Sequence, residues 1–131
     1  MSYKKPTSAD DRPPFTHPAY IYRATIKKIV DGDTIDVLID VGFGIYVTKR
    51  LRFLLIDTWE VRGEEREKGL IAKERLRELV TTAETVYVQT IMDTRGKYGR
   101  VLAWVWTENQ DLLLNVNKIL LDEGHGTLYG S

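Results

Sequence analysis

The alternation of apolar and polar positions predicts strands in the first half of the chain. Tyr20–Val30 is rich in β-branched and aromatic residues, which favour a strand. The Asp31-Gly32 pair predicts a tight hairpin turn, because glycine tolerates the positive φ that such turns require. Thr34–Asp40 alternates with one exception, as a return strand would. A further glycine turn leads into a third predicted strand over Ile45–Ile56.

The periodicity changes to a helical one in the second half. Apolar residues recur at helical spacing over Gly69–Ala83, while charged residues occupy the other face. Two more strands are expected at Thr85–Ile91 and Arg100–Trp106, and a second helix over Leu112–Glu123 that ends at Gly124. The order βββ-α-ββ-α, with five strands and a helix between the third and fourth, predicts an OB-fold. This is a β-barrel with helices, in the α+β class.

The domain organisation is simple. A chain of 131 residues suits one domain. All four prolines lie within the polar segment 1–18, which is expected to be an extended or disordered arm, and 19–131 to be a single domain. No apolar run approaches the roughly 18 residues of a membrane helix, so no membrane span is expected. Residues 1–20 contain no leader-like apolar segment, so localisation stays open: an exported protein would have lost its leader.

Composition excludes several kinds of chemistry. The chain has no cysteine, which rules out disulfides, thiol catalysis and zinc–cysteine sites. Only His17 and His125 could supply imidazole, so any metal is expected to be a hard cation held by oxygen. The 19 basic and 19 acidic residues cancel, which argues against binding of nucleic acid through bulk charge and leaves a local site open.

Three acidic residues are candidates for a functional site. Asp33 follows the first turn, and Asp57 and Glu60 close the third predicted strand. In an extended strand Asp57 would lie about 17 Å from Arg52, so the two can share a site only if the strand curls. Converging carboxylates repel one another unless a cation lies between them. The alternative is that the aspartates only form or cap turns.

Two arginines could bind phosphate. Arg52 lies in an otherwise apolar stretch, and Arg100 follows Lys97, Tyr98 and a glycine at the start of a strand. A guanidinium group matches phosphate with two parallel hydrogen bonds, which an ammonium cannot do. The alternative for the arginines is an ion pair with Asp or Glu, and for Lys97 and Tyr98 an ordinary exposed loop.

Taken together, these motifs resemble the staphylococcal nuclease (thermonuclease) family. The resemblance runs over most of Tyr20–Gly124 and rests on three elements in order: Val30-Asp31-Gly32-Asp33-Thr34, Arg52-x4-Asp57-Thr58-x-Glu60 and Lys97-Tyr98-Gly99-Arg100. It implies an OB-fold endonuclease that uses Ca²⁺ to hydrolyse phosphodiester bonds of DNA and RNA with little sequence specificity. Single-stranded substrates and products with a 3′-phosphate are expected, as is a monomer.

The resemblance also implies roles for individual residues. Those expected to bind Ca²⁺ are Asp33, Asp57 and the backbone carbonyl of Thr58. Those expected to act in catalysis are Glu60, on the attacking water, and Arg52 and Arg100, on the phosphate. Those expected near the terminal phosphate of the nucleotide are Lys97 and Tyr98.

The chain departs from the family pattern in several places. Trp59 stands where the family usually has proline, and residues 62–68 replace a longer, lysine-rich loop. The third helix of the family is not evident after Gly124. The competing hypothesis is a non-catalytic OB module that binds single-stranded nucleic acid or protein. Such a module would be expected to lack some of the five carboxylate and arginine positions, all of which are present here.

Overall fold

A computed structural model describes residues 20–92 and 101–128 of the chain. The strands in these residues are β1 (Ile21–Asp31), β2 (Thr34–Asp40), β3 (Tyr46–Phe53), β4 (Ile56–Thr58), β5 (Thr85–Met92), β6 (Val101–Asn109), β7 (Leu112–Asn115) and β8 (Gly126–Leu128). The helices are the short 3-10 helix η2 (Gly63–Glu65) and the α-helices α1 (Arg66–Thr81) and α2 (Val116–Asp122).

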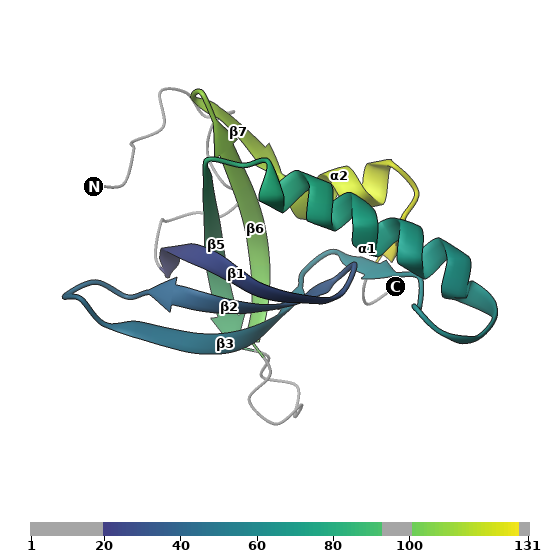
Figure 1. The fold of residues 1–131 in the computed structure, drawn as a ribbon, viewed down its shortest axis with the longest axis horizontal. Coiled ribbons are helices and arrows are strands. Elements are labelled where there is room, and N and C mark those ends of the chain that lie inside the picture. Colours follow the sequence, from purple (N-terminus) through teal and green to yellow (C-terminus); the bar gives the residue numbers. More distant parts are fainter. Residues whose placement is uncertain (1–19, 93–100, 129–131) are drawn as a thin grey trace.

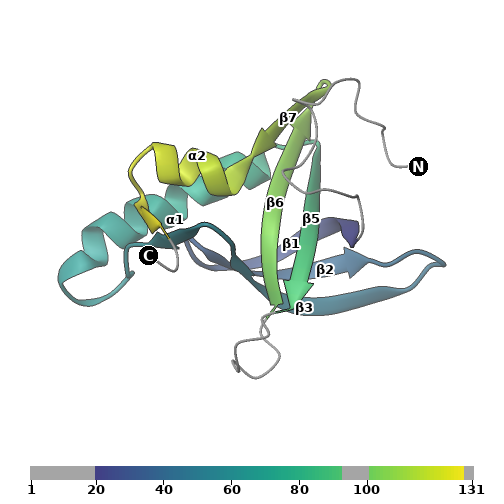
Figure 2. The same ribbon diagram turned by 180° about the vertical axis from the view of Figure 1, so that it is seen from behind.

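Five strands close into a barrel, which confirms the predicted OB-fold. Strands β3, β2, β1, β5 and β6 pair in that order, and each neighbouring pair is antiparallel. Parallel pairing of β3 with β6, from Leu51↔Val101 to Phe53↔Ala103, closes the barrel. Helix α1 crosses one side of this barrel, with α2 beside it (Figures 1 and 2).

The two periodicities in the sequence build one core. Side chains on alternate β2 positions, Ile35, Val37 and Ile39, are buried inside the barrel. The apolar stripe of α1, which includes Leu76 and Val80, joins them in the same hydrophobic cluster. The helix therefore covers the barrel with the face that its 3.6-residue pattern predicts.

Two predicted elements were too long. The third strand was expected to continue to Ile56, but β3 ends at Phe53, and Leu55 adopts a φ of 77° that breaks the strand before β4. The second helix was expected from Leu112, but that segment is β7, which pairs with β6. Helix α2 begins only after Asn115, whose side chain caps it by accepting the Lys118 N–H at 3.1 Å.

Strands β4 and β8 form a small second sheet that the sequence did not predict. They pair through Ile56↔Leu128, Asp57↔Thr127 and Thr58↔Gly126. Between α2 and β8 the chain turns at Gly124, whose φ of 82° fits the predicted helix end. This small sheet ties the segment after the barrel strand β3 to the C-terminal part of the domain.

Neither α-helix in the described ranges is long and apolar enough to cross a membrane. The predicted arm, residues 1–18, lies outside the described residues, so its boundary with the domain stays a prediction.

A single buried amide joins α2 to the barrel. Asn117 is fully buried, and its Oδ1 accepts the Val105 N–H at 2.8 Å. Its Nδ2 donates to the carbonyls of Leu54 at 2.7 Å and Ala103 at 3.0 Å. Asn117 therefore satisfies the Val105 N–H of β6 and the Leu54 carbonyl in the bend after β3, whereas the Ala103 carbonyl also accepts the Leu54 N–H at 2.9 Å.

We expect Asn117→Ala to destabilise the fold by about 2 kcal/mol or more, because it removes the partner of the Val105 N–H and that of the Leu54 carbonyl. Urea unfolding followed by circular dichroism measures this change in the free energy of unfolding. Lys118→Ala, at the exposed neighbouring position of the same helix, should change it by less than about 0.5 kcal/mol. Equal stability of the two variants would contradict the role assigned to Asn117.

Candidate active site

A small polar pocket of about 160 Å³ lies where the β1–β2 turn meets β4. Its walls carry four carboxylates and one guanidinium group. The lining residues are Asp31, Asp33, Thr34, Arg52, Asp57, Thr58, Trp59 and Glu60. Five of the eight residues predicted for the site therefore line a single pocket, although they come from separate segments.

Asp33 links the β1–β2 turn to β4. Its side chain is buried, and Oδ2 accepts the backbone N–H of Thr58 at 2.9 Å. Oδ1 accepts the hydroxyl of Thr34 at 2.9 Å. The alternative considered for Asp33, a cap on a backbone amide, is thus present in the structure, and it fixes the carboxylate at the edge of the pocket.

Arg52 holds the bend that follows β3. Its Nη1 donates to the carbonyls of Phe53 and Ile56, each at 2.8 Å. Its Nη2 lies 3.1 Å from Oδ1 of Asp57 and 3.5 Å from Oδ2 of Asp33. The chain after Arg52 therefore bends back, as it must if Arg52 and Asp57 are to share one site. The ion-pair alternative for Arg52 also holds, because its side chain is only 12% exposed and bridges two carboxylates.

Three glycines allow backbones to approach the site closely. A Cβ on Gly69 of α1 would lie 2.0 Å from the Glu60 carbonyl oxygen, and one on Gly126 of β8 would lie 2.3 Å from that of Asp57. The prediction that Gly32 supplies a positive φ is wrong. In the described residues the glycines with a positive φ are Gly42, Gly44, Gly63 and Gly124. Gly32 is needed for space instead, since its Cβ would lie 3.1 Å from Thr58 and Ala72 side-chain atoms.

Trp59 is docked onto the turn between α2 and β8. Its indole Nε1 donates to the Gly124 carbonyl at 3.1 Å, and its backbone N–H donates to the His125 carbonyl at 3.2 Å. Lys68 Nζ lies 5.0 Å from the ring centroid, within cation–π range. The residue that replaces the family's proline thus restrains the chain between Asp57 and Glu60 through tertiary contacts.

An ion pair holds the turn on which Trp59 docks. Arg75 of α1 donates to both carboxylate oxygens of Glu123, at 2.7 and 2.9 Å. These hydrogen bonds lower the pKa of Glu123, so its carboxylate stays charged throughout the neutral range. His125 Nε2 lies 3.4 Å from the same carboxylate. The α2–β8 turn is therefore fastened to α1 on one side and to Trp59 on the other.

The residues at the pocket suit a hard cation by donor type. All candidate donors are oxygens, which calcium prefers. The hydroxyl of Thr58 is buried without a hydrogen-bond partner in the described part of the chain. Within residues 20–92 and 101–128, however, no three acidic or imidazole side chains already stand close enough together to hold a metal. Arg52 instead contacts two of the carboxylates.

The remaining predicted residues, Lys97, Tyr98 and Arg100, lie outside the described residues. Sequence reasoning missed the contributions of Gly69 and Gly126, and that of Asp31 to the pocket wall. The only local signal for Gly69 was a glycine in a segment with helical periodicity, where it costs up to about 1 kcal/mol relative to alanine.

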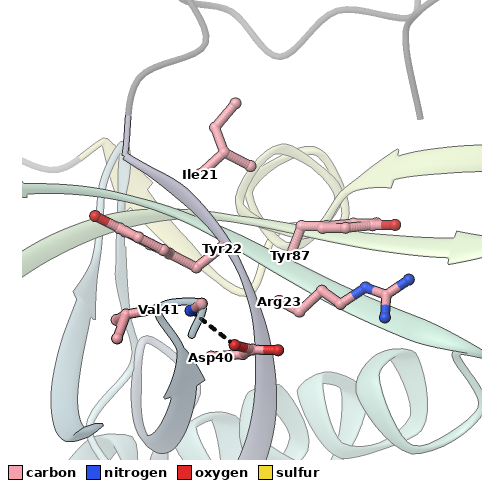
Figure 3. A pocket seen from close by; sticks show the side chains of 7 residues that line it. Ile21, Tyr22, Arg23, Asp40, Val41 and Tyr87 are labelled. Atoms are coloured by element: carbon pink, nitrogen blue, oxygen red, sulfur yellow. Dashed lines mark hydrogen bonds between the residues drawn. The ribbon is translucent and has the colours of Figure 1, made fainter. Parts of the chain in front are cut away.

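A second pocket lies at the opposite end of β1 and β2 (Figure 3). It is lined by aromatic and aliphatic side chains together with Arg23 and Asp40. Asp40 accepts the Gly42 N–H at 2.9 Å, so its carboxylate closes the β2–β3 turn. Burial raises the pKa of the Tyr87 hydroxyl, which is neutral at physiological pH. With a single carboxylate, this pocket is a poor candidate for the metal site.

The described strands form a five-stranded OB barrel in which Asp33 of the β1–β2 turn and Asp57 of β4 gather around Arg52 near the end of β3. The family model described as staphylococcal nuclease homologue matches residues 50–130. The chain belongs to the staphylococcal nuclease family. The matched range includes Arg52, Asp57 and Glu60, whereas Asp33 precedes it.

Curated relatives extend the similarity toward the N-terminus. Endonuclease YncB of Bacillus subtilis (strain 168) is 33% identical over 109 residues, covering 79% of this chain and 46% of the relative. The SPbeta prophage-derived endonuclease YokF of the same organism is 34% identical over 103 residues, covering 76% and 32%. Micrococcal nuclease of Shigella flexneri is 32% identical over 113 residues, covering 82% and 59%. The chain thus spans between 32% and 59% of the length of these relatives.

We expect Gly69→Ala to destabilise the protein by roughly 1–3 kcal/mol, because the new methyl group meets the Glu60 backbone. Helix propensity alone predicts the opposite sign, a gain of up to about 1 kcal/mol. Thermal and urea unfolding distinguish the two. Glu67→Ala, at an exposed position of the same helix, serves as control and should change stability little. A stabilised Gly69→Ala variant would show that the contact between α1 and Glu60 is not tight.

Proposed function

We propose that this chain is a calcium-dependent nuclease that hydrolyses phosphodiester bonds of DNA and RNA with little sequence specificity, leaving 3′-phosphorylated products. The observation that carries the proposal is the convergence of Asp33, Arg52 and Asp57 in one polar pocket that Glu60 also lines. Membership of the staphylococcal nuclease family and the nuclease names of its relatives support it.

The metal would be held by Asp33, Asp57 and the backbone carbonyl of Thr58. Asp33 is suited to this because the Thr58 N–H and the Thr34 hydroxyl fix its orientation. Asp57 is suited because its side chain is 58% exposed and can reach a ligand in the pocket. When bound, Ca²⁺ would supply positive charge that polarises a phosphodiester and offsets the charge of the carboxylates.

Glu60 is proposed to orient the attacking water and accept its proton. Its side chain is exposed and lines the pocket. Its backbone is held in place by two contacts: its N–H donates to Glu65 Oε1 at 2.9 Å, and its carbonyl packs against Gly69. A carboxylate on a fixed backbone beside the phosphate position meets the geometric requirement for a general base.

Arg52 and Arg100 are proposed to bind the phosphate and stabilise its developing charge. Arg52 carries its Nη2 beside the two carboxylates proposed to hold the metal, so a phosphate oxygen could accept a hydrogen bond from it once a cation offsets their charge. Arg100 directly precedes Val101, which pairs with Leu51 next to Arg52. Lys97 and Tyr98 are proposed to bind the substrate near this position. The resemblance also favours single-stranded substrates and a monomeric protein.

The competing proposal is a non-catalytic OB module. It is less well supported, because Asp33, Asp57 and Glu60 occur together with both arginines. A binding module has no need for an exposed glutamate held by α1 at the edge of an acidic pocket. The two proposals differ in turnover, which is directly measurable.

We expect single-stranded DNA and RNA to be degraded in the presence of Ca²⁺ and to remain intact in the presence of a chelator. The reason is that the pocket carries several carboxylates and needs a cation to accept a phosphate. Gel assays with end-labelled oligonucleotides measure cleavage, and end analysis shows whether a 3′-phosphate is left. Undiminished cleavage in chelator would contradict the calcium dependence, and binding without cleavage would favour the non-catalytic module.

We expect Glu60→Gln to lower kcat by about 10²-fold or more while Ca²⁺ affinity changes little, because the amide cannot accept the proton from water. Calorimetric titration with Ca²⁺ and cleavage rates separate these two properties. Glu67→Gln, an exposed glutamate of α1, is the matched control and should behave as the unmodified protein. Loss of Ca²⁺ binding in Glu60→Gln with an unchanged kcat at saturating metal would remove Glu60 from the role of base.

A further inference from the structure

One column of side chains on β3 runs from the proposed active site toward the end of the β2–β3 hairpin. The column consists of every second residue of β3, and each of them lies opposite a residue of β2. The pairs are Arg52 with Thr34, Arg50 with Asp36, Thr48 with Leu38, and Tyr46 with Asp40. The β2 residues between them are the buried Ile35, Val37 and Ile39. The column therefore lies on the outer face of the barrel, because successive side chains of a strand alternate between faces. The hairpin itself projects well beyond the barrel (Figure 1).

The orientation of the Arg50 side chain in this column is fixed by an ion pair with Asp36. Its Nε and Nη2 donate to the two carboxylate oxygens at 2.7 and 3.0 Å, across neighbouring strands. The Arg50 side chain is nevertheless 61% exposed. A guanidinium group has five N–H donors, so the remaining ones are available to a ligand such as a phosphate. The pair with Asp36 also reduces the mobility that a free arginine would lose on binding.

The far end of the column carries exposed aromatic residues. Tyr46 is 56% exposed, and Phe43 at the hairpin turn is 98% exposed. Phe43 has a φ of 59° and lies between Gly42 and Gly44, with φ values of 88° and 72°. A bulky residue in the left-handed region is strained, and here no burial within the described chain offsets that strain. Its ring is therefore free to meet a ligand at the end of the hairpin.

Basic residues exceed acidic ones on this outer face of β1, β2 and β3. In the strand register the face carries Arg23, Lys28, Arg50 and Arg52, against Asp36 and Asp40. Lys28 and Arg50 are exposed. Lys49 lies opposite the buried Val37 and so belongs to the other face of β3. The excess of positive charge complements a polyanion, although the whole chain is neutral.

We propose that the outer face of β3, from Arg52 through Arg50 to Tyr46 and Phe43, is a binding track for the part of a single-stranded nucleic acid that extends beyond the nucleotide in the pocket. Phosphates of the strand contact Arg50, and its bases stack on Tyr46 and Phe43. Aromatic platforms along a basic surface are the means by which OB-folds bind single strands with little sequence preference. The proposal builds on the proposed function for the occupant of the pocket.

The test compares oligonucleotides that can and cannot reach the track. Labelled single strands of about three and about twelve nucleotides bracket the lower part of the site-size range of an OB-fold. Binding is measured by fluorescence anisotropy with Ca²⁺ in a Glu60→Gln background, where cleavage is slow and the metal is retained, and KM and kcat are measured with Ca²⁺ in the protein with Glu60 intact. We expect Tyr46→Ala to weaken binding of the longer strand and raise its KM by about tenfold. Binding of the trinucleotide and kcat should change less than about twofold.

Two further variants isolate the stacking contribution. Tyr46→Phe keeps the aromatic face and should bind the longer strand as the unmodified protein does. Leu112→Ala removes an equally exposed apolar side chain from β7 and should have no effect on either strand. Thermal unfolding verifies that each variant is folded.

The track and the proposed function can fail separately. If Tyr46→Ala binds both lengths as tightly as the unmodified protein, or weakens both equally, the track is wrong while the nuclease proposal stands. If the longer strand binds through Tyr46 but is never cut, the track stands and the nuclease proposal fails. If the unmodified protein binds the longer strand no better than the trinucleotide, the track is also overturned.

Discussion

The arrangement of the domain around its site depends on one partly buried guanidinium group. Arg52 leaves the barrel at the end of β3, and its charge must be compensated because its side chain is only 12% exposed. It meets this requirement by drawing in Asp33 from the β1–β2 turn and Asp57 from β4, and by binding the carbonyls of Phe53 and Ile56. These contacts compensate the charge of Arg52. They also bend the chain after β3 and bring the carboxylates of Asp33 and Asp57 together. Fold and site therefore share a single electrostatic constraint, and a change at Arg52 affects both.

The segment after Asp57 is held by close packing rather than by its own stiffness. Gly69 on α1 and Gly126 on β8 let two backbones approach it more closely than any side chain would allow. Trp59 adds two hydrogen bonds to the α2–β8 turn, which Arg75 and Glu123 fasten to α1. Where the staphylococcal nuclease pattern has proline, which restricts the chain covalently, this protein restrains it through tertiary contacts. The position of Glu60 thus depends on parts of the chain that are distant in sequence.

The sequence predicted the elements whose pattern is long and regular. The barrel strands and α1 were recognised from their periodicity, and their ends differ from the prediction by a few residues. The short strands β4, β7 and β8 were missed, because three or four residues carry too little pattern and their pairing partners are distant in sequence. For the site, motif spacing named Asp33, Arg52 and Asp57, but only the bend shows how they meet. The reason given for Gly32 was wrong because close packing leaves no trace in local sequence.

The charge distribution explains how a chain with no net charge can be suited to a polyanion. The acidic residues that balance the basic ones are not spread evenly, and four of them line the pocket. Under the proposed function they repel phosphate until a cation is bound. Others, such as Asp36, orient arginines: its pKa is lowered by the hydrogen bonds from Arg50, so the pair persists at any pH near neutral. Under the two proposals, attraction to nucleic acid comes from individually oriented groups rather than from a long-range field. The pocket then determines whether a phosphate can bind, and the outer face of β3 determines how much of the strand is held.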